Sequence, residues 1–223
     1  MSDFFNKNSR PMRFLSNVAN IMIINLFFII SSIPIITMGA ALSTSYRLIF
    51  MILEGEDVFL FRDYSRFFVS SFKNSTLIWI PTLLAMGLFG YEVFMIATFM
   101  DQSYKWFLIP IFIVLFAFVS LFYYAFPMTG LYKQSIKQTV KNSLILSVSN
   151  APVTIMFIAM DFLVIFLSYK SFVLLIVFLS VYMFFGFALA FLIKGYFLRK
   201  IFLKHGDVAP DYDDTETGRD NEN

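Results

Sequence analysis

Three polar side chains, Asn25, Glu92 and Asp161, interrupt stretches of the sequence that are otherwise strongly apolar. Two carboxylates and an amide inside a membrane could line a cavity for a cation, a proton or a hydroxylated ligand, because a buried carboxylate is costly unless it is paired, hydrated or protonated. The same side chains could instead form hydrogen bonds between helices and fix their packing, with Lys105 or Lys170 reaching inward to a carboxylate. Both interpretations stay open at the level of the sequence.

Motifs typical of enzymes and metalloproteins are missing from the sequence. It contains no Gly-rich phosphate loop, no nucleophile elbow and no His-Glu-x-x-His metal motif. There is no Cys, and the only His, His205, lies near the C-terminus, which excludes thiolate metal sites and His clusters. We therefore expect a protein that is not an enzyme, with no catalytic residue, no metal and no cofactor.

The composition places these residues in a membrane. The chain is 59% hydrophobic, 20% aromatic and only 14% charged, whereas soluble domains are about 45–50% apolar and about 25% charged. A helix needs roughly 20 apolar residues to cross the hydrocarbon layer. The sequence therefore predicts an all-α, polytopic bundle of five transmembrane helices. The expected spans are residues 18–38, 76–99, 106–127, 147–168 and 171–193.

The chain is expected to form one membrane domain, residues 1–205, followed by a tail. Residues 206–223 hold seven of the 15 acidic residues and one of the 17 basic ones. Such a segment has little apolar surface to bury, and it is predicted to be a disordered acidic tail.

Lysine and arginine counts give an orientation. If the chain crosses the membrane five times, five of the 17 basic residues lie on the same side of the membrane as the N-terminus, and twelve lie on the opposite side. The positive-inside rule then predicts an N-terminus outside and a cytoplasmic C-terminus, although Lys7, Arg10 and Arg13 before the first span favour the reverse for that span. In the predicted orientation the three intramembrane polar residues lie at similar depth, about 10 Å inside the outer boundary.

The longest connection, residues 39–75, is expected to be cytoplasmic and carries a second candidate surface. Its aromatic residues Phe61, Tyr64, Phe68 and Phe72 recur at spacings of three and four, a pattern typical of an amphipathic helix at a membrane interface. This helix could anchor the segment on lipid or dock a partner. The candidate residues for lipid or partner docking are Phe61, Arg62, Asp63, Arg66, Phe72 and Lys73.

A second basic segment lies between the third and fourth expected spans. Lys133, Lys137 and Lys141 are spaced four residues apart and would share one helical face. Phosphate headgroups are the expected counter-charge, and nucleic acid is not expected as a partner, because three lysines beside two spans are ordinary membrane flanks.

The sequence resembles the YesL-like family of bacterial integral membrane proteins, a domain of unknown function. The resemblance is strongest over residues 10–80 and implies a small multi-spanning protein of the plasma membrane of Gram-positive-type bacteria, often encoded near sugar-uptake transporters or polysaccharide-use enzymes. It carries over no catalytic or binding residue. The matching features are Met12-Arg13-Phe14, Asn25-Leu26, Pro34 with Thr37 and Gly39-Ala40, Arg62-Asp63, and Phe72-Lys73-Asn74.

Two functions are compatible with this sequence. The first is a non-enzymatic accessory or regulator of carbohydrate uptake, with the lipid bilayer and a sugar transporter subunit as partners. The second is a small secondary transporter or channel that uses the polar layer in the outer half of the bilayer. Because five spans are few for a monomeric carrier, the second function would require a homo-oligomer or a partner.

Overall fold

The structure is a computed structural model that describes residues 10–204, and in this range the chain is helical and contains no strand. The expected acidic tail and His205 lie outside the described residues. In chain order the elements are α1 (Arg10–Ser32), the 3-10 turn η2 (Ile35–Thr37), α2 (Met38–Glu54), α3 (Leu60–Phe99), the 3-10 segment η3 (Gln102–Phe107), α4 (Leu108–Leu131), α5 (Ile136–Ser149), α6 (Ala151–Lys170), α7 (Phe172–Val181), the π-helical turn η4 (Tyr182–Gly186) and α8 (Phe187–Lys204).

The predicted helical membrane fold is confirmed, because five helical stretches are long and apolar enough to cross a membrane. Their bounds differ from the expected ones at the N-terminal end. The expected first span covered residues 18–38, but α1 ends at Ser32 and its apolar part, Ser16–Ser32, is shorter than the others. The five stretches are Ile35–Glu54, Leu60–Phe99, Leu108–Leu131, Ala151–Lys170 and Phe172–Lys204.

The break between α1 and α2 has a local cause at Pro34. Proline lacks a backbone N–H, and it disfavours helical geometry at the preceding residue, so α1 ends before it. The hydroxyl of Thr37 donates hydrogen bonds to the carbonyl oxygens of Ser31 and Pro34, and the indole N–H of Trp79 donates to the carbonyl oxygen of Ile35 at 2.6 Å. The carbonyls freed by the break are therefore bound by side chains, one of them from α3.

Helix α2 lies at the centre of the fold, which corrects the expectation that residues 39–75 form a cytoplasmic connection between two spans. Residues 39–46 and 48–50 are all buried. Small side chains at the start of α2 let its neighbours approach closely: a Cβ on Gly39 would lie 2.7 Å from the Cβ of Trp79. Gly55 ends the helix with a φ of 79°, the left-handed conformation that glycine adopts without strain.

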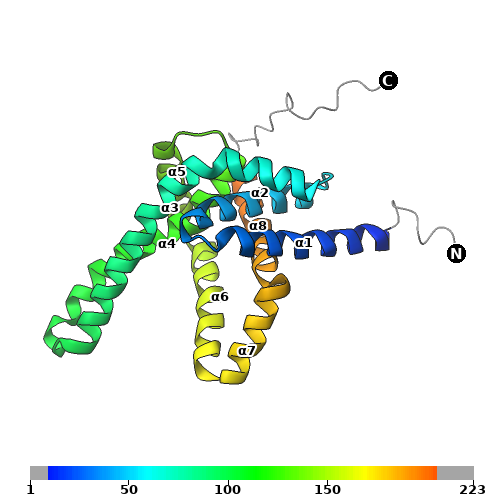
Figure 1. The fold of residues 1–223 in the computed structure, drawn as a ribbon. Coiled ribbons are helices and arrows are strands. Elements are labelled where there is room, and N and C mark those ends of the chain that lie inside the picture. The colour runs from blue at the N-terminus through cyan, green and yellow to red at the C-terminus, as the bar shows by residue number, and fades with distance from the viewer. Residues whose placement is uncertain (1–9, 205–223) are drawn as a thin grey trace, which may run out of the picture.

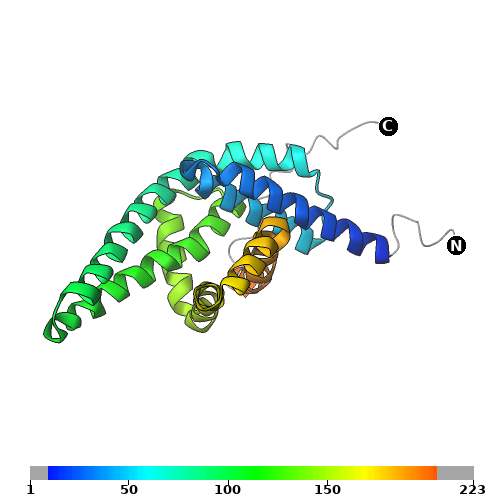
Figure 2. The same ribbon diagram turned by 60° about the horizontal axis from the view of Figure 1, so that its bottom comes forward.

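Two helical hairpins diverge from this centre. Figure 1 shows α3 and α4 running side by side to one tip, and α6 and α7 descending to another. Figure 2, the turned view, keeps the two hairpins apart, and α1 runs from the centre to the side opposite the tip of the α3–α4 hairpin. Both views show that α3 changes direction along its length, and this helix contains Pro81, whose missing N–H weakens the helical ladder.

The hairpins expose large apolar side chains along their lengths. Examples are Leu88 at 66%, Phe162 at 63% and Leu179 at 70% of their surface. In water such surfaces would associate, but hydrocarbon solvates them. The fold is therefore that of a multi-pass membrane protein whose buried core is built around α2.

Candidate functional site

An ion pair connects two helices of the second hairpin region. Asp161 lies on α6 and Lys194 on α8, and the ammonium nitrogen of Lys194 is 2.8 Å from each carboxylate oxygen of Asp161. The Lys194 side chain is only 6% exposed, whereas that of Asp161 is 35% exposed. A buried lysine needs such a partner, because an isolated charge is costly in an apolar environment. Removal of one partner of a buried ion pair lowers the free energy of unfolding by about 3–5 kcal/mol.

Tyr123 of α4 completes a three-residue cluster with this pair. Its hydroxyl donates to Oδ2 of Asp161 at 2.5 Å, and the Lys194 nitrogen lies 4.8 Å from the centre of its ring. The carboxylate therefore accepts charge-assisted hydrogen bonds from two directions, and the ammonium group faces both an anion and an aromatic ring. Three helices that are distant in sequence meet at one polar point.

The Asp161–Lys194 pair faces a groove of about 470 Å³. Its other walls are mostly apolar and come from six helices and the turn η4. They include Phe28 of α1, Leu42 of α2, Phe122 of α4, Ile165 of α6, Leu179 of α7 and Phe191 of α8. A site of this kind suits an amphipathic molecule that places a hydroxyl or charged group at the ion pair and apolar atoms along the walls.

Asn25 has a structural position beside the groove. Its amide nitrogen donates to the carbonyl oxygens of Tyr182 and Met183 at 3.1 and 3.0 Å, and its amide oxygen accepts from the backbone N–H of Ala188 at 3.1 Å. These backbone groups belong to η4 and to the start of α8, where the π-helical turn disturbs the regular ladder. Asn25 therefore holds the π-helical turn in place.

The π-helical turn in turn positions a wall of the groove. The ring of Tyr182 packs on Gly186, where an added Cβ would lie 2.9 Å from the ring, and Tyr182 lines the groove together with Phe187. Asn25 thus supports the groove through the backbone of η4 without lining it. The structure brings Asn25 and Asp161 to the same region but gives them separate hydrogen-bond networks.

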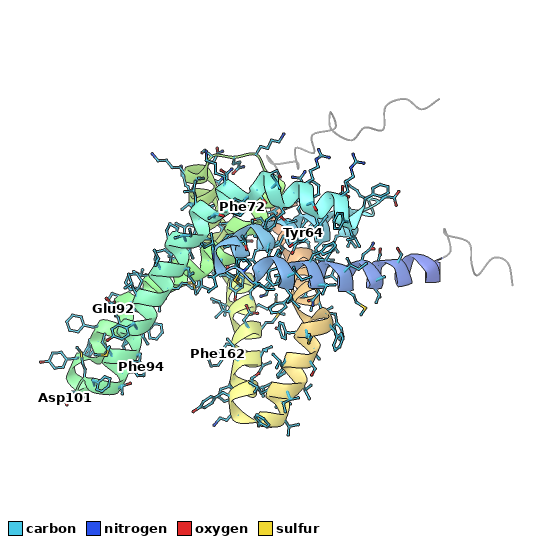
Figure 3. The ribbon with its side chains drawn as sticks, viewed as in Figure 1. Tyr64, Phe72, Glu92, Phe94, Asp101 and Phe162 are labelled. Atoms are coloured by element: carbon cyan, nitrogen blue, oxygen red, sulfur yellow. The ribbon has the colours of Figure 1, made fainter. Side chains whose placement is uncertain are left out.

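Glu92 is separated from the other two predicted polar residues. It is exposed on α3 and does not line the groove. Figure 3 places it, with Phe94 and Asp101, toward the outer part of the α3–α4 hairpin and away from Phe162 on α6. The three residues therefore do not form the expected layer. Glu92 lies on the α3–α4 hairpin and Asp161 on the α6–α7 hairpin, and the two hairpins diverge, so an equal predicted depth does not bring the residues together.

The structure also identifies partners that the sequence did not indicate. Asp161 pairs with Lys194, whereas Lys105 or Lys170 were the expected candidates; the nitrogen of Lys170 lies 5.6 Å from the centre of the Phe166 ring instead. Lys194 follows the last residue of the expected fifth span and resembled an ordinary basic flank. One signal was available: α8 continues with apolar residues on both sides of Lys194, so this lysine is inside a helix of span length.

The predicted docking residues lie in the N-terminal part of α3, and they differ in their exposure. Phe61 is 77% exposed and Phe72 37% exposed, and Arg62 and Lys73 are also exposed. Asp63 instead accepts a hydrogen bond from the backbone N–H of Phe59 at 2.8 Å, near the start of the helix.

The aromatic pattern of this segment does not form a single exposed stripe. Tyr64 is buried, and its ring packs on Phe27 of α1 with a centroid distance of 5.1 Å. Phe67, which is outside the predicted stripe, is buried under the guanidinium of Arg47, whose carbon lies 3.7 Å from the ring centre. The segment is therefore anchored on α1 and α2 by some of its aromatic residues, such as Tyr64, and exposes others, such as Phe72.

The chain matches the profile of a known family over part of its length. The profile of a family described as "Protein of unknown function, DUF624" matches residues 21–93. The matched range includes Asn25, α2 and most of α3, but it ends before Asp161 and Lys194. The chain is thus similar over this range to a family of unknown function, and neither the curated proteins nor the solved structures gave a match.

Proposed function

We propose that this chain is a YesL-like accessory protein of the bacterial plasma membrane that assists or regulates carbohydrate uptake without catalysing a reaction. The resemblance of residues 10–80 supports the proposal, and the region of similarity to the family of unknown function overlaps it. In this proposal the N-terminus is outside and the C-terminus is cytoplasmic, and its support is the excess of basic residues that the expected spans place on the same side of the membrane as the C-terminus.

The observation that carries the proposal is the exposed aromatic and basic surface at the start of α3. We define the α3 docking surface as Phe61, Arg62, Phe72 and Lys73, which are all exposed. The helix beneath it is fixed, because Tyr64 and the hydroxyl of Ser31 on α1 are joined by a 2.5 Å hydrogen bond. A rigid helix that presents aromatic and basic side chains fits an acidic, aromatic-containing surface on a sugar transporter subunit.

Co-purification tests this proposal directly. The full chain is expected to recover a sugar transporter subunit in stoichiometric amount after extraction in mild detergent. The triple variant Phe61→Ala/Arg62→Ala/Lys73→Ala should lose that subunit while it accumulates normally. A matched control is Lys170→Ala/Phe172→Ala, which removes an exposed aromatic and basic pair at the turn between α6 and α7. Equal recovery by all three proteins, or recovery of no transporter subunit by the unaltered chain, contradicts the proposal.

A second candidate function is favoured by the groove. An ion pair that faces about 470 Å³ of mostly apolar space is the arrangement expected of a small oligomeric carrier with a polar site. Purified protein in liposomes would then take up a labelled sugar, and the exchange Asp161→Asn would abolish uptake. Uptake by liposomes that contain only this protein supports the carrier, whereas uptake that needs the recovered transporter subunit supports the accessory protein.

A further inference from the structure

A second, smaller cavity lies between α2, α3 and the end of α4, apart from the groove. It has a volume of about 110 Å³. We call it the polar cavity and define it by six of its polar lining residues, Thr44, Arg47, Ser71, Asn74, Tyr132 and Lys133. None of these residues lines the groove that holds Asp161 and Lys194.

The walls of the polar cavity are held by close helix contacts. Gly130 of α4 lies against α2 so closely that an added Cβ would be 2.3 Å from the carbonyl oxygen of Ser43. The hydroxyls of Ser43 and Ser75 are joined by a buried hydrogen bond of 2.8 Å, which connects α2 with α3. The space between the three helices is therefore a fixed feature of their packing.

The charged side chains that line the cavity are both basic. Arg47 and Lys133 contribute to the lining, and no carboxylate does so among the described residues. Arg47 is held in place, since its Nη1 donates to the carbonyl oxygen of Gly130 at 3.2 Å and its guanidinium lies over the ring of Phe67. Lys133 is exposed and lies two residues after the last residue of α4, Leu131.

Thr44 provides an independent indication that the cavity takes a ligand. Its side chain is fully buried, it lines the cavity, and its hydroxyl has no hydrogen-bond partner. Buried polar groups in folded proteins are nearly always paired, and each exception requires an explanation. A ligand oxygen in the cavity would accept the hydroxyl proton and supply the missing partner.

We propose that the polar cavity binds a phosphoryl group. A tetrahedral oxyanion has acceptor atoms for donors that come from several directions, here a hydroxyl, a guanidinium, an ammonium group and the amide of Asn74. With a volume of about 110 Å³, the cavity is large enough for such an anion. The phosphoryl group comes from an anionic lipid headgroup or from a free phosphate ester, whose remainder would extend past Lys133.

The first test measures thermal unfolding of the full chain in a detergent without phosphate. Inorganic phosphate should raise the unfolding temperature saturably, and chloride at equal ionic strength should not. The variant Thr44→Val keeps the side-chain shape and removes the hydroxyl, so it should raise the half-saturating phosphate concentration about tenfold. Its unfolding temperature without phosphate should equal or exceed that of the unaltered protein, because the unpaired hydroxyl is gone.

A matched control separates ligand binding from the removal of a buried hydroxyl. Thr76 of α3 also has a buried hydroxyl oxygen without a partner, but it does not line the polar cavity. The variant Thr76→Val should therefore leave the phosphate response unchanged. Lys133→Ala alters an exposed residue and should weaken the phosphate response without loss of folding. An absent phosphate response, or an equal response in all four proteins, overturns the proposal.

The source of the phosphoryl group is decided by reconstitution. Vesicles of phosphatidylcholine alone are compared with vesicles that also contain phosphatidylglycerol, each with and without glucose 6-phosphate. If phosphatidylglycerol stabilises the unaltered protein and this effect is smaller in the Thr44→Val variant, the phosphoryl group is a lipid headgroup. Stabilisation by glucose 6-phosphate in phosphatidylcholine vesicles identifies a free ester. If neither has an effect that depends on Thr44, the proposal is wrong, and this result would leave the docking of a transporter subunit on α3 unaffected.

Discussion

The ammonium nitrogen of Lys194 lies 2.8 Å from both carboxylate oxygens of Asp161, so one side chain of α8 is bound by one side chain of α6. The two charges are unequally placed, because the lysine is buried and the aspartate partly faces the groove. The lysine therefore depends on the aspartate, whereas the aspartate retains contact with whatever enters the groove. This asymmetry is the basis of the first prediction.

Removal of the aspartate charge should destabilise the protein. Asp161→Asn leaves Lys194 buried beside a neutral group, and we expect a loss of about 3 kcal/mol in the free energy of unfolding. The double variant Asp161→Leu/Lys194→Met should recover most of that loss, since it removes both charges and keeps the volume. Chemical denaturation of the purified full chain in detergent measures both changes. Glu92→Gln is the control and should have little effect, because Glu92 is exposed. A double variant that is less stable than Asp161→Asn would contradict this account.

Loss of the Asn25 side chain should disturb the π-helical turn. Asn25→Leu is similar in volume but leaves the carbonyl oxygens of Tyr182 and Met183 and the N–H of Ala188 without their side-chain partner. Because a buried polar group that loses its partner costs about 1–3 kcal/mol, we expect destabilisation of about 2–3 kcal/mol. Thermal unfolding measures it, with Asn17→Leu at an exposed position of the same helix as control. Equal stability of the two variants would show that η4 does not depend on Asn25.

Two glycine substitutions should have opposite effects. Gly130→Ala would place a Cβ 2.3 Å from the carbonyl oxygen of Ser43, so α2 and α4 must separate; we expect a loss of about 2–3 kcal/mol. Gly87→Ala on α3 meets no atom within 4 Å, and it should be neutral or stabilise the helix by about 0.5–1 kcal/mol. Unfolding measurements on both variants in one detergent provide the comparison. The close approach of α2 and α4 is refuted if Gly130→Ala is as stable as Gly87→Ala.

Hydropathy predicts the elements of this fold better than their contacts. The helices around Asp161 and Glu92 follow from long apolar runs, and the structure confirms five such stretches. The helical composition of residues 40–53 was evident, but their central position was not: Gly39, Ala40 and Ala41 were assigned to a cytoplasmic connection, although they are buried in the core. Small residues signal close packing only when the partner helix is known.

The candidate site could be predicted only in part for a related reason. Asp161 stands out in an apolar run, but its partner Lys194 lies 33 residues away on another helix. Which helices meet depends on the directions of the two hairpins, and residue spacing along each helix does not contain that information. Glu92 illustrates the same limit: its predicted depth resembles that of Asp161, yet it lies on the other hairpin.

Membrane topology provides the last prediction. If the five apolar stretches each cross once and α1 does not, the two termini lie on opposite faces, and the basic-residue count places the C-terminus inside. A reporter that is fluorescent only in the cytoplasm should then give a signal when it is fused to the C-terminus. A reporter that is active only outside the cytoplasm should give a signal when it is fused to the N-terminus. A third fusion in the turn between α6 and α7, near the exposed Tyr169, should report outside. Cytoplasmic signals from both termini would contradict this topology, because they require an even number of crossings. Such a result is expected if α2, the most buried of the five stretches, stays within the protein core and does not cross the bilayer.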